Sequence, residues 1–108
     1  MKFEAKYSKN AQRDFETIFE WIADRSSPAT AERFVLAIYS TCEELKAFPF
    51  RGNARDDISP GLRTLGFRRR SVIAFTVVGA DVTVHGVYYG GQQHEASARG
   101  RISIDGEK

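Results

Sequence analysis

The sequence predicts an α+β fold of two layers, in which an antiparallel α-hairpin packs on a small, largely antiparallel sheet in the order β-α-α-β-β-β. Three observations predict it. Residues 2–7 alternate between polar and apolar side chains, residues 8–48 carry two apolar stripes at helical spacing, and residues 62–89 contain three strand-like runs separated by turns. A chain of 108 residues is long enough to bury one hydrophobic core, so we expect a single domain.

The N-terminal segment KFEAKY places Phe3, Ala5 and Tyr7 on one face, which indicates a short first strand. Ser8 can then cap a helix, because its hydroxyl accepts a hydrogen bond from an amide of the first turn. The apolar stripe of this helix comprises Ala11, Phe15, Ile18, Phe19 and Ile22. We expect its other face to be solvated, with the charged residues Arg13, Asp14, Glu16, Glu20 and Asp24.

The segment RSSPAT ends the first helix and begins a second, with Ser27 as its cap and Pro28 at its first position. This helix ends before Pro49. Because the connection is so short, the two helices must lie antiparallel as a hairpin. The second apolar stripe comprises Ala31, Phe34, Val35, Ile38, Cys42 and Leu45.

A loop rich in Gly, Pro, Asn and Asp follows, and after it come three strand candidates. They are Leu62–Phe67, Arg69–Val78 and Val82–Tyr89, and GAD joins the last two as a hairpin. The middle candidate is apolar on both faces, although helices of a two-layer fold cover only one. We therefore expect the second face to contact a partner, another copy or the C-terminal tail, unless the strand is simply central in the sheet.

The composition is that of a globular protein, and it excludes several functional classes. The single cysteine, Cys42, excludes an internal disulfide and fits a reducing cytoplasm. No apolar stretch reaches the roughly 20 residues that cross a bilayer. The spacing of Cys42, His85 and His94 matches no zinc site. The net charge of +2 is too modest for a protein that coats nucleic acid nonspecifically.

Four arginines, Arg63 and Arg68–Arg70, stand around the entry to the middle strand candidate, and no acidic residue occurs between Leu62 and Gly79. Guanidinium groups pair bidentately with carboxylates and phosphates, so the cluster is a candidate site for an acidic partner or a phosphate. The alternative is a solvated loop in which one arginine lies over a ring such as that of Phe67.

Trp21 lies at the margin of the first apolar stripe. It either completes the core beside Tyr7 or Phe34 or anchors a partner, because tryptophan is enriched at interface hot spots.

The order and spacing of several short motifs resemble the RelE/ParE superfamily of toxins from type II toxin–antitoxin modules. The motifs are FPFRG, ISPGLRTL, VIAFTV and VTVHGVYYGGQQHE. The resemblance covers about residues 2–95 and implies one toxin domain over 1–95, followed by a polar tail over 96–108 that we expect to be mobile. The long helices and the PGLR segment look more like the ParE branch. Gln93 departs from the family, which frequently has an acidic residue there.

ParE-type toxins block DNA gyrase, whereas RelE-type toxins cut mRNA on the ribosome. The resemblance therefore implies a cytoplasmic toxin of the plasmid-stabilisation type that binds and inhibits gyrase. It further implies neutralisation by an acidic, ParD-like antitoxin in a hetero-oligomer, and no cofactor, metal, membrane contact or sequence-specific DNA binding. The resemblance and the arginine cluster together make the following residues candidate contacts with target or antitoxin: Arg63, Arg68, Arg69, Arg70, Tyr88, Tyr89 and Trp21.

Two alternatives remain from the same resemblance. One is a degenerate toxin that only binds its antitoxin and co-regulates transcription. The other is a metal-independent endoribonuclease, which needs a base, an acid and cations around the reacting phosphate. Its candidate groups are Arg63, His85 and Tyr89.

Strict alternation would place His85 with Tyr89 and away from Tyr88. A bulge at Gly86 would exchange the faces, so either tyrosine could join the histidine. Binding an acidic partner or a phosphate needs only the cations, whereas cleavage also needs a correctly placed acid and base. We therefore favour the prediction of a toxin that acts by binding.

Overall fold

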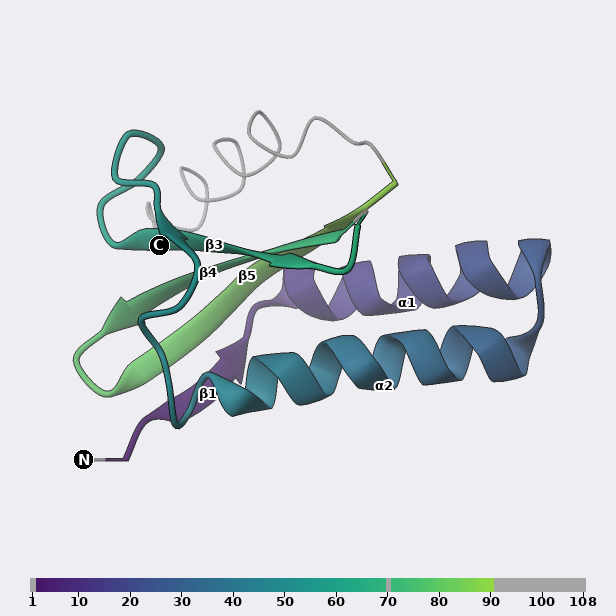
Figure 1. Cartoon of the computed structure of the whole chain (residues 1–108), viewed down its shortest axis with the longest axis horizontal. Coiled ribbons are helices and arrows are strands. Elements are labelled where there is room, and N and C mark those ends of the chain that lie inside the picture. The colour runs from purple at the N-terminus through teal and green to yellow at the C-terminus, as the bar shows by residue number, and fades with distance from the viewer. Residues whose placement is uncertain (1, 70, 91–108) are drawn as a thin grey trace.

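Two helices cover one face of a five-stranded sheet in residues 2–69 and 71–90, the part of the chain that this computed structural model describes (Figure 1). Both helices lie on the same side of the sheet, antiparallel to each other. The expected tail over 96–108 lies outside the described residues. The elements are β1 (Glu4–Tyr7), α1 (Lys9–Arg25), α2 (Pro28–Glu44), β2 (Asn53–Ala54), β3 (Leu62–Phe67), β4 (Ser71–Val78) and β5 (Asp81–Tyr89).

The sheet has the strand order β1-β5-β4-β3-β2. All neighbouring strands are antiparallel except β1, which pairs parallel with β5. The predicted two-layer α+β fold is therefore confirmed. Some details differ from the prediction; β5, for example, begins at Asp81 rather than Val82. The two-residue strand β2 lies inside the segment that we expected to be a loop, and β4 begins at Ser71 rather than Arg69, because Arg68 takes a left-handed backbone conformation that belongs to a turn.

Serine caps begin both helices, as the sequence predicts. The Ser8 Oγ accepts a hydrogen bond from the Ala11 amide at 3.1 Å and donates one to the His85 carbonyl at 3.1 Å. The cap of α1 thereby also fastens the helix to β5. Ser27 caps α2 by accepting from the Thr30 amide at 3.1 Å, and Pro28 occupies the first turn, where no amide is needed.

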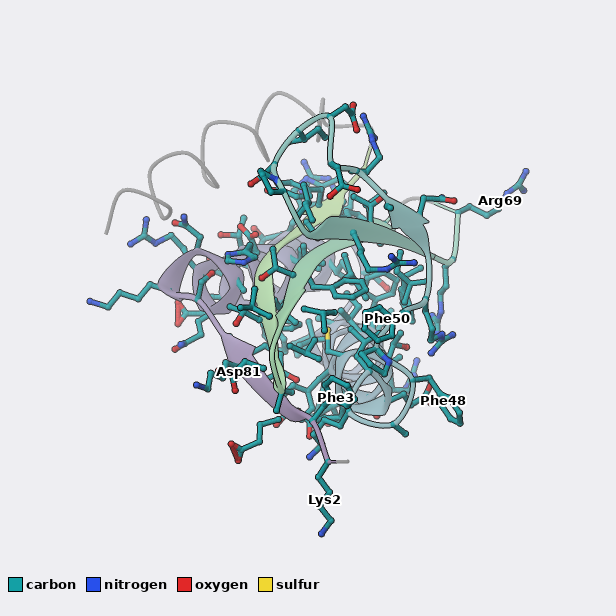
Figure 2. All side chains as sticks on the ribbon, turned by 90° about the vertical axis from the view of Figure 1, so that its left-hand side faces the viewer. Lys2, Phe3, Phe48, Phe50, Arg69 and Asp81 are labelled. Carbon is teal, nitrogen blue, oxygen red and sulfur yellow. The ribbon has the colours of Figure 1, made fainter. Side chains whose placement is uncertain are left out.

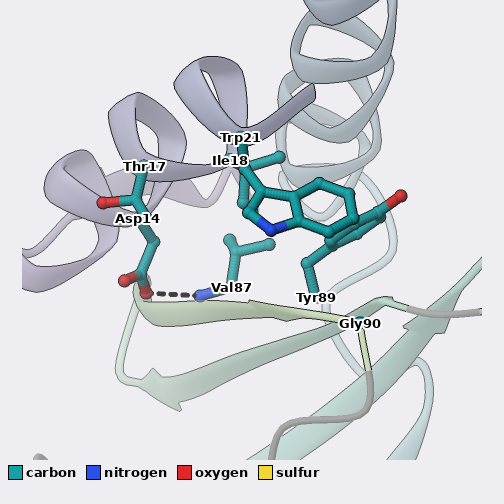
Figure 3. A pocket seen from close by; sticks show the side chains of 7 residues that line it. All are labelled: Asp14, Thr17, Ile18, Trp21, Val87, Tyr89 and Gly90. Atoms are coloured by element: carbon teal, nitrogen blue, oxygen red, sulfur yellow. Dashed lines mark hydrogen bonds between the residues drawn. The ribbon is translucent and has the colours of Figure 1, made fainter. Parts of the chain in front are cut away.

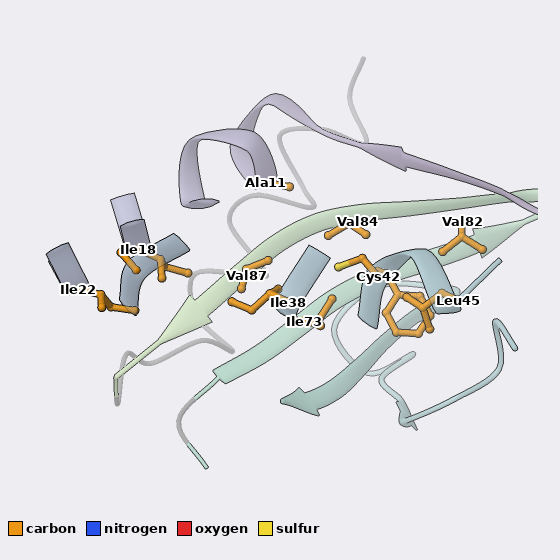
Figure 4. Packing of buried hydrophobic residues seen from close by; sticks show 12 residues of the cluster. Ala11, Ile18, Ile22, Ile38, Cys42, Leu45, Ile73, Val82, Val84 and Val87 are labelled. Atoms are coloured by element: carbon orange, nitrogen blue, oxygen red, sulfur yellow. The ribbon is translucent and has the colours of Figure 1, made fainter. Parts of the chain in front are cut away.

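The hydrophobic core lies between the helical hairpin and the sheet (Figure 4). Ile18 and Ile22 of α1 and Ile38 and Cys42 of α2 pack on buried side chains of β4 and β5. Burial raises the pKa of the Cys42 thiol to about 12, so this side chain behaves as a core residue and not as a nucleophile. The sheet contributes Ile73, Phe75, Val82, Val84 and Val87 to this core.

The opposite face of the sheet carries a small second cluster. Leu62, Ala74 and Tyr88 are buried there, and Ile58 from the loop before β3 packs against them. The chain itself therefore covers part of the face for which we expected a partner. The far end of β4 remains open, because Val78 is 68% exposed.

A hydrogen-bonded clamp joins the first strand to the end of α2. The Tyr7 hydroxyl donates to Glu43 Oε2 at 2.6 Å, and Lys46 Nζ lies 2.8 Å from Glu43 Oε1. Lys46 first, and Tyr7 second, lower the pKa of the Glu43 carboxyl. Burial and the bond to Glu43 raise the pKa of Tyr7. The tyrosine ring also stacks on Tyr39 of α2 with ring centroids 5.4 Å apart.

Replacing Tyr7 by Phe keeps the ring contacts and removes the hydrogen bond, so we expect a loss of about 1–2 kcal/mol in the free energy of unfolding at pH 7. Because the pKa of Glu43 is lowered in the folded state, its contribution is present above the ordinary value of 4.5 and is lost as the pH falls through the folded-state pKa. Urea unfolding at pH 7 and pH 3 should therefore show a smaller difference between Tyr7→Phe and the wild type at pH 3. An equal difference at both pH values contradicts the clamp.

Gly52 allows the loop before β2 to approach β3. It has a φ of +75°, and a Cβ added there would overlap the carbonyl oxygen of Thr64. We expect Gly52→Ala to cost at least about 2 kcal/mol and Gly61→Ala, which has a similar φ but open space around it, about 1 kcal/mol. Gly66→Ala in β3 is the matched control with neither constraint, and it should be close to neutral. Urea denaturation midpoints test this ranking of the three variants. Equal losses of stability in Gly52→Ala and Gly66→Ala would refute it.

Candidate binding surface

Four aromatic rings from four different elements form a continuous row where the helical hairpin meets the end of the sheet. Trp21 of α1 packs on Tyr89 of β5 with centroids 5.2 Å apart, and Tyr89 packs on Phe34 of α2 at 5.3 Å. Phe34 in turn packs on Phe67 of β3 at 5.7 Å. All these contacts are edge-to-face arrangements, which stabilise aromatic pairs beyond the area they bury. We call these four residues the aromatic row.

A guanidinium group covers each end of the aromatic row. The Arg25 Cζ lies 4.0 Å from the centroid of the Trp21 ring. At the other end, the Arg68 Cζ lies 5.1 Å from the Phe67 ring and 5.4 Å from the Phe34 ring. Both are cation–π contacts. Trp21 itself is 39% exposed, and its ring packs on Tyr89, whereas the predicted neighbour was Tyr7 or Phe34.

The arginines that lie together in the sequence have separate surroundings in the structure. Arg69 is exposed and its side chain points away from the body of the molecule (Figure 2). Among the described residues, no carboxylate lies within 4.0 Å of the Arg68 or Arg69 guanidinium. Arg70 lies outside the described residues. This turn therefore presents positive charge that the described part of the chain does not neutralise by ion pairs.

Arg63 is part of the loop structure and not of this turn. Its Nε donates to the Arg51 carbonyl at 3.0 Å and its Nη2 to the Phe50 carbonyl at 3.2 Å. The Arg63 Cζ also lies 5.8 Å from the Phe50 ring. The planar fork of one guanidinium thus binds two successive carbonyl groups of the loop that precedes β2.

A β-bulge decides where the candidate groups of β5 lie. Ala74 of β4 pairs with Gly86 and Phe75 pairs with Val84, so His85 is an extra residue in β5. His85 therefore shares the face of Tyr88, away from the helices, where its Nε2 lies 2.9 Å from the Thr76 Oγ1. Tyr89 lies on the helix-covered face with the aromatic row.

The three candidate groups of a ribonuclease site are therefore not brought together. Arg63 binds loop carbonyls, His85 lies on the sheet face away from the helices, and Tyr89 packs between Trp21 and Phe34. Within residues 2–69 and 71–90, no group of three or more His, Cys, Asp and Glu side chains could hold a metal ion.

A pocket of about 210 Å³ opens beside the aromatic row (Figure 3). Asp14 lies in its wall with 8% of its surface exposed, and its Oδ2 accepts a hydrogen bond from the Val87 amide at 2.9 Å. The expectation that Asp14 belongs to a solvated face is wrong, because the bulge turns the Val87 amide towards α1 and the carboxylate accepts from it. The full lining comprises Asp14, Thr17, Ile18, Trp21, Val87, Tyr89 and Gly90.

Two further apolar surfaces are open on the helical side. A shallow groove of about 510 Å³ is lined by Phe15, Phe19 and Val35, with Glu16 and Glu20 also in its lining. At the sheet end of the hairpin, Phe48 and Phe50 are 68% and 67% exposed, close to Phe3 in Figure 2. The Phe3 and Phe50 rings are 6.3 Å apart. The motif FPFRG contains both exposed phenylalanines, but sequence periodicity does not show that they face outwards.

Comparisons with known proteins agree with this fold. A family model described as the ParE toxin of type II toxin–antitoxin system, parDE, matches residues 5–93. The chain is similar to a solved chain of the chromosomal ParDE system from P. aeruginosa, with a TM-score of 0.71 and 23% identity over 81% of this chain and 95% of that one. It is also similar to a mutant of the E. coli toxin RelE in the free state, with a TM-score of 0.61 and 13% identity over 90% and 93%. No curated protein sequence matches it.

The two hydrogen bonds of Arg63 predict that a lysine, which has the same charge, cannot replace this arginine without a loss of stability. Arg63→Lys keeps the positive charge but cannot bind two carbonyls as a planar fork, so we expect a loss of about 1–2 kcal/mol in the free energy of unfolding. Arg69→Lys, at an exposed position, is the matched control and should be neutral. Urea unfolding measures both. Unchanged stability of Arg63→Lys would return this residue to the candidate contacts with a phosphate or partner.

Proposed function

The chain belongs to the ParE toxin family of type II toxin–antitoxin systems, and on that premise we propose that it acts by binding and inhibiting DNA gyrase. The observation that carries the choice of binding over catalysis is the separation of Arg63, His85 and Tyr89. General acid–base cleavage of RNA needs an acid, a base and cations within hydrogen-bonding reach of one phosphate. His85 and Tyr89 lie on opposite faces of the sheet, which supports binding over catalysis by this set of residues. Because gyrase is a cytoplasmic enzyme, the proposal places the toxin in the cytoplasm.

The surface proposed to contact the target is the turn between β3 and β4 together with the exposed edge of the aromatic row. Arg69 provides a charge that points into solvent, and Trp21 provides a partly exposed ring at one end of the aromatic row. Tryptophan and arginine are the residues most enriched among energetic hot spots of interfaces. The aromatic row holds this surface on regular elements, so its rings lose little conformational freedom on binding.

The proposed partner that neutralises the toxin is an acidic, ParD-like antitoxin. An acidic segment fits the arginine turn better than the helical groove, because Glu16 and Glu20 line that groove. Leu36 and Tyr39 of α2 are further exposed apolar residues. An antitoxin that covers the turn would mask the same cations that contact the target, which accounts for neutralisation without any chemical change in the toxin.

The ribonuclease alternative keeps one supporting observation, which is the similarity of fold to the E. coli toxin RelE. That similarity, at 13% identity, concerns the fold alone. The regulator alternative differs from both, because it predicts that expression without antitoxin leaves growth unchanged.

We expect the purified, antitoxin-free toxin to inhibit the supercoiling of relaxed plasmid by gyrase, and Arg69→Gln to weaken this inhibition about three- to tenfold with a smaller salt dependence. Arg13→Gln, a charge change at an exposed position in the second turn of α1, is the matched control and should leave inhibition unchanged. The conservative variants His85→Gln and Tyr89→Phe should also inhibit.

A different set of outcomes would overturn the proposal. Toxin in excess that leaves supercoiling intact contradicts gyrase inhibition. Primer extension on ribosome-bound mRNA that shows cuts, and loses them with Tyr89→Phe, would establish the ribonuclease instead. Absence of growth arrest on expression without the antitoxin would favour the regulator.

A further inference from the structure

The strand β1 lies at one end of the strand order, and in residues 2–69 and 71–90 it is paired along one edge only, with β5. Its four residues, Glu-Ala-Lys-Tyr, place a carboxylate and an ammonium group two positions apart on the same face of the strand. We propose that the open edge of β1 pairs with β1 of a second copy of this chain, antiparallel and centred on Ala5.

The backbone of β1 supplies the first argument. The amides of Glu4 and Ser8 donate hydrogen bonds of 2.9 and 3.0 Å to carbonyls on the β5 side. Because the direction of the hydrogen bonds alternates along a strand, the amides of Ala5 and Tyr7 point away from β5. Neither amide has a hydrogen-bond partner within the part of the chain that the structure describes. An unpaired edge of this kind is a template for another strand.

The side chains of Glu4 and Lys6 supply the second argument, because they make this edge complementary to itself. In an antiparallel pair centred on Ala5, Glu4 of each copy lies directly opposite Lys6 of the other, and opposite charges at such positions attract. Lys6 Nζ lies 3.2 Å from Asp81 Oδ2 in its own chain. Glu4, by contrast, has no cation within 4.0 Å among the described residues, and the second copy would supply one.

The charges also select the register. A parallel pair in register, or an antiparallel pair centred on Glu4 or Lys6, places like charges opposite each other, which is destabilising. The selected pair joins two five-stranded sheets into one continuous sheet. Because β5 and β4 separate β1 from β3, the turn that carries Arg69 stays exposed in both copies (Figure 2). The proposal does not depend on gyrase being the target.

The contact is small, so we expect a weak dimer. Four strand residues from each copy bury less than the roughly 1,200 Å² at which stable, specific interfaces begin. Sedimentation velocity of the full chain without antitoxin should show a dimer fraction that rises between roughly 10 and 500 μM protein. The association should weaken as the salt concentration rises. A monomer throughout this range contradicts the proposal.

Charge reversal tests whether β1 is the contact. Glu4→Lys places lysine opposite lysine and Lys6→Glu places glutamate opposite glutamate, so each variant should self-associate at least about fivefold more weakly. The double variant Glu4→Lys/Lys6→Glu restores opposite charges and should associate within about twofold of the wild type. An equimolar mixture of the two single variants should form a heterodimer. Glu16→Lys, the same charge change at an exposed position of α1, is the matched control and should leave the association unchanged.

Hydrogen exchange reports on the edge itself. The Ala5 amide should exchange more slowly as the protein concentration rises, because pairing protects it. The Lys6 amide points towards β5 and is the internal control, since its protection should not depend on concentration. Far-UV circular dichroism checks that each variant keeps its fold.

Three further results would overturn the proposal. The first is self-association that both charge reversals leave unchanged. The second is a double variant, or a mixture of the single variants, that associates no better than each single variant alone. The third is exchange of the Ala5 amide that is independent of concentration in a sample that sedimentation shows to be dimeric.

Discussion

The arrangement of the binding surface depends on one extra residue in the last strand. Because Gly86 and Val84 pair with successive residues of β4, His85 is an extra residue between them, and the strand exchanges its faces at this point. Tyr89 consequently turns towards the helices and Tyr88 away from them. The Asp14 carboxylate accepts from the Val87 amide directly after the bulge, which connects α1 to the strand where its direction changes. Without the bulge, the aromatic row would lack the ring that joins its two halves.

The aromatic row in turn explains how the helical hairpin meets the sheet. Tyr89 contacts both Trp21 and Phe34, so a single residue at the end of β5 holds both helices. Phe67 and Arg68 extend this contact to the turn between β3 and β4. The part of the surface proposed to bind a partner is therefore built on four packed elements, and only its outer edge is exposed. Such a support lets exposed groups keep their positions when a partner approaches.

The arginine-rich segment shows how residues of one type take different roles. Arg63 binds two carbonyls of a loop, Arg68 lies over two rings, and Arg69 extends into solvent. The first is structural and the last is available to a partner. Arg68 is the arginine that lies over the Phe67 ring, as one of the two sequence-based interpretations predicted. A role as a binding cation is proposed for Arg69. A count of charges in the segment cannot make this distinction.

The amino-acid sequence was enough to predict the order of the elements other than β2, the caps at Ser8 and Ser27, and the family. These features follow from local spacing: an apolar stripe every 3.6 residues, a serine before a helix, and short motifs in a constant order. The face of Tyr89, the burial of Asp14 and the contacts of Arg63 and Arg68 became evident only in the folded chain. The physical reason is that each of these depends on a contact between segments far apart in the chain, such as Asp14 with Val87 or Arg63 with Arg51. A bulge of one residue leaves the periodicity of its own strand ambiguous, and the packing of the helix against that strand resolves it.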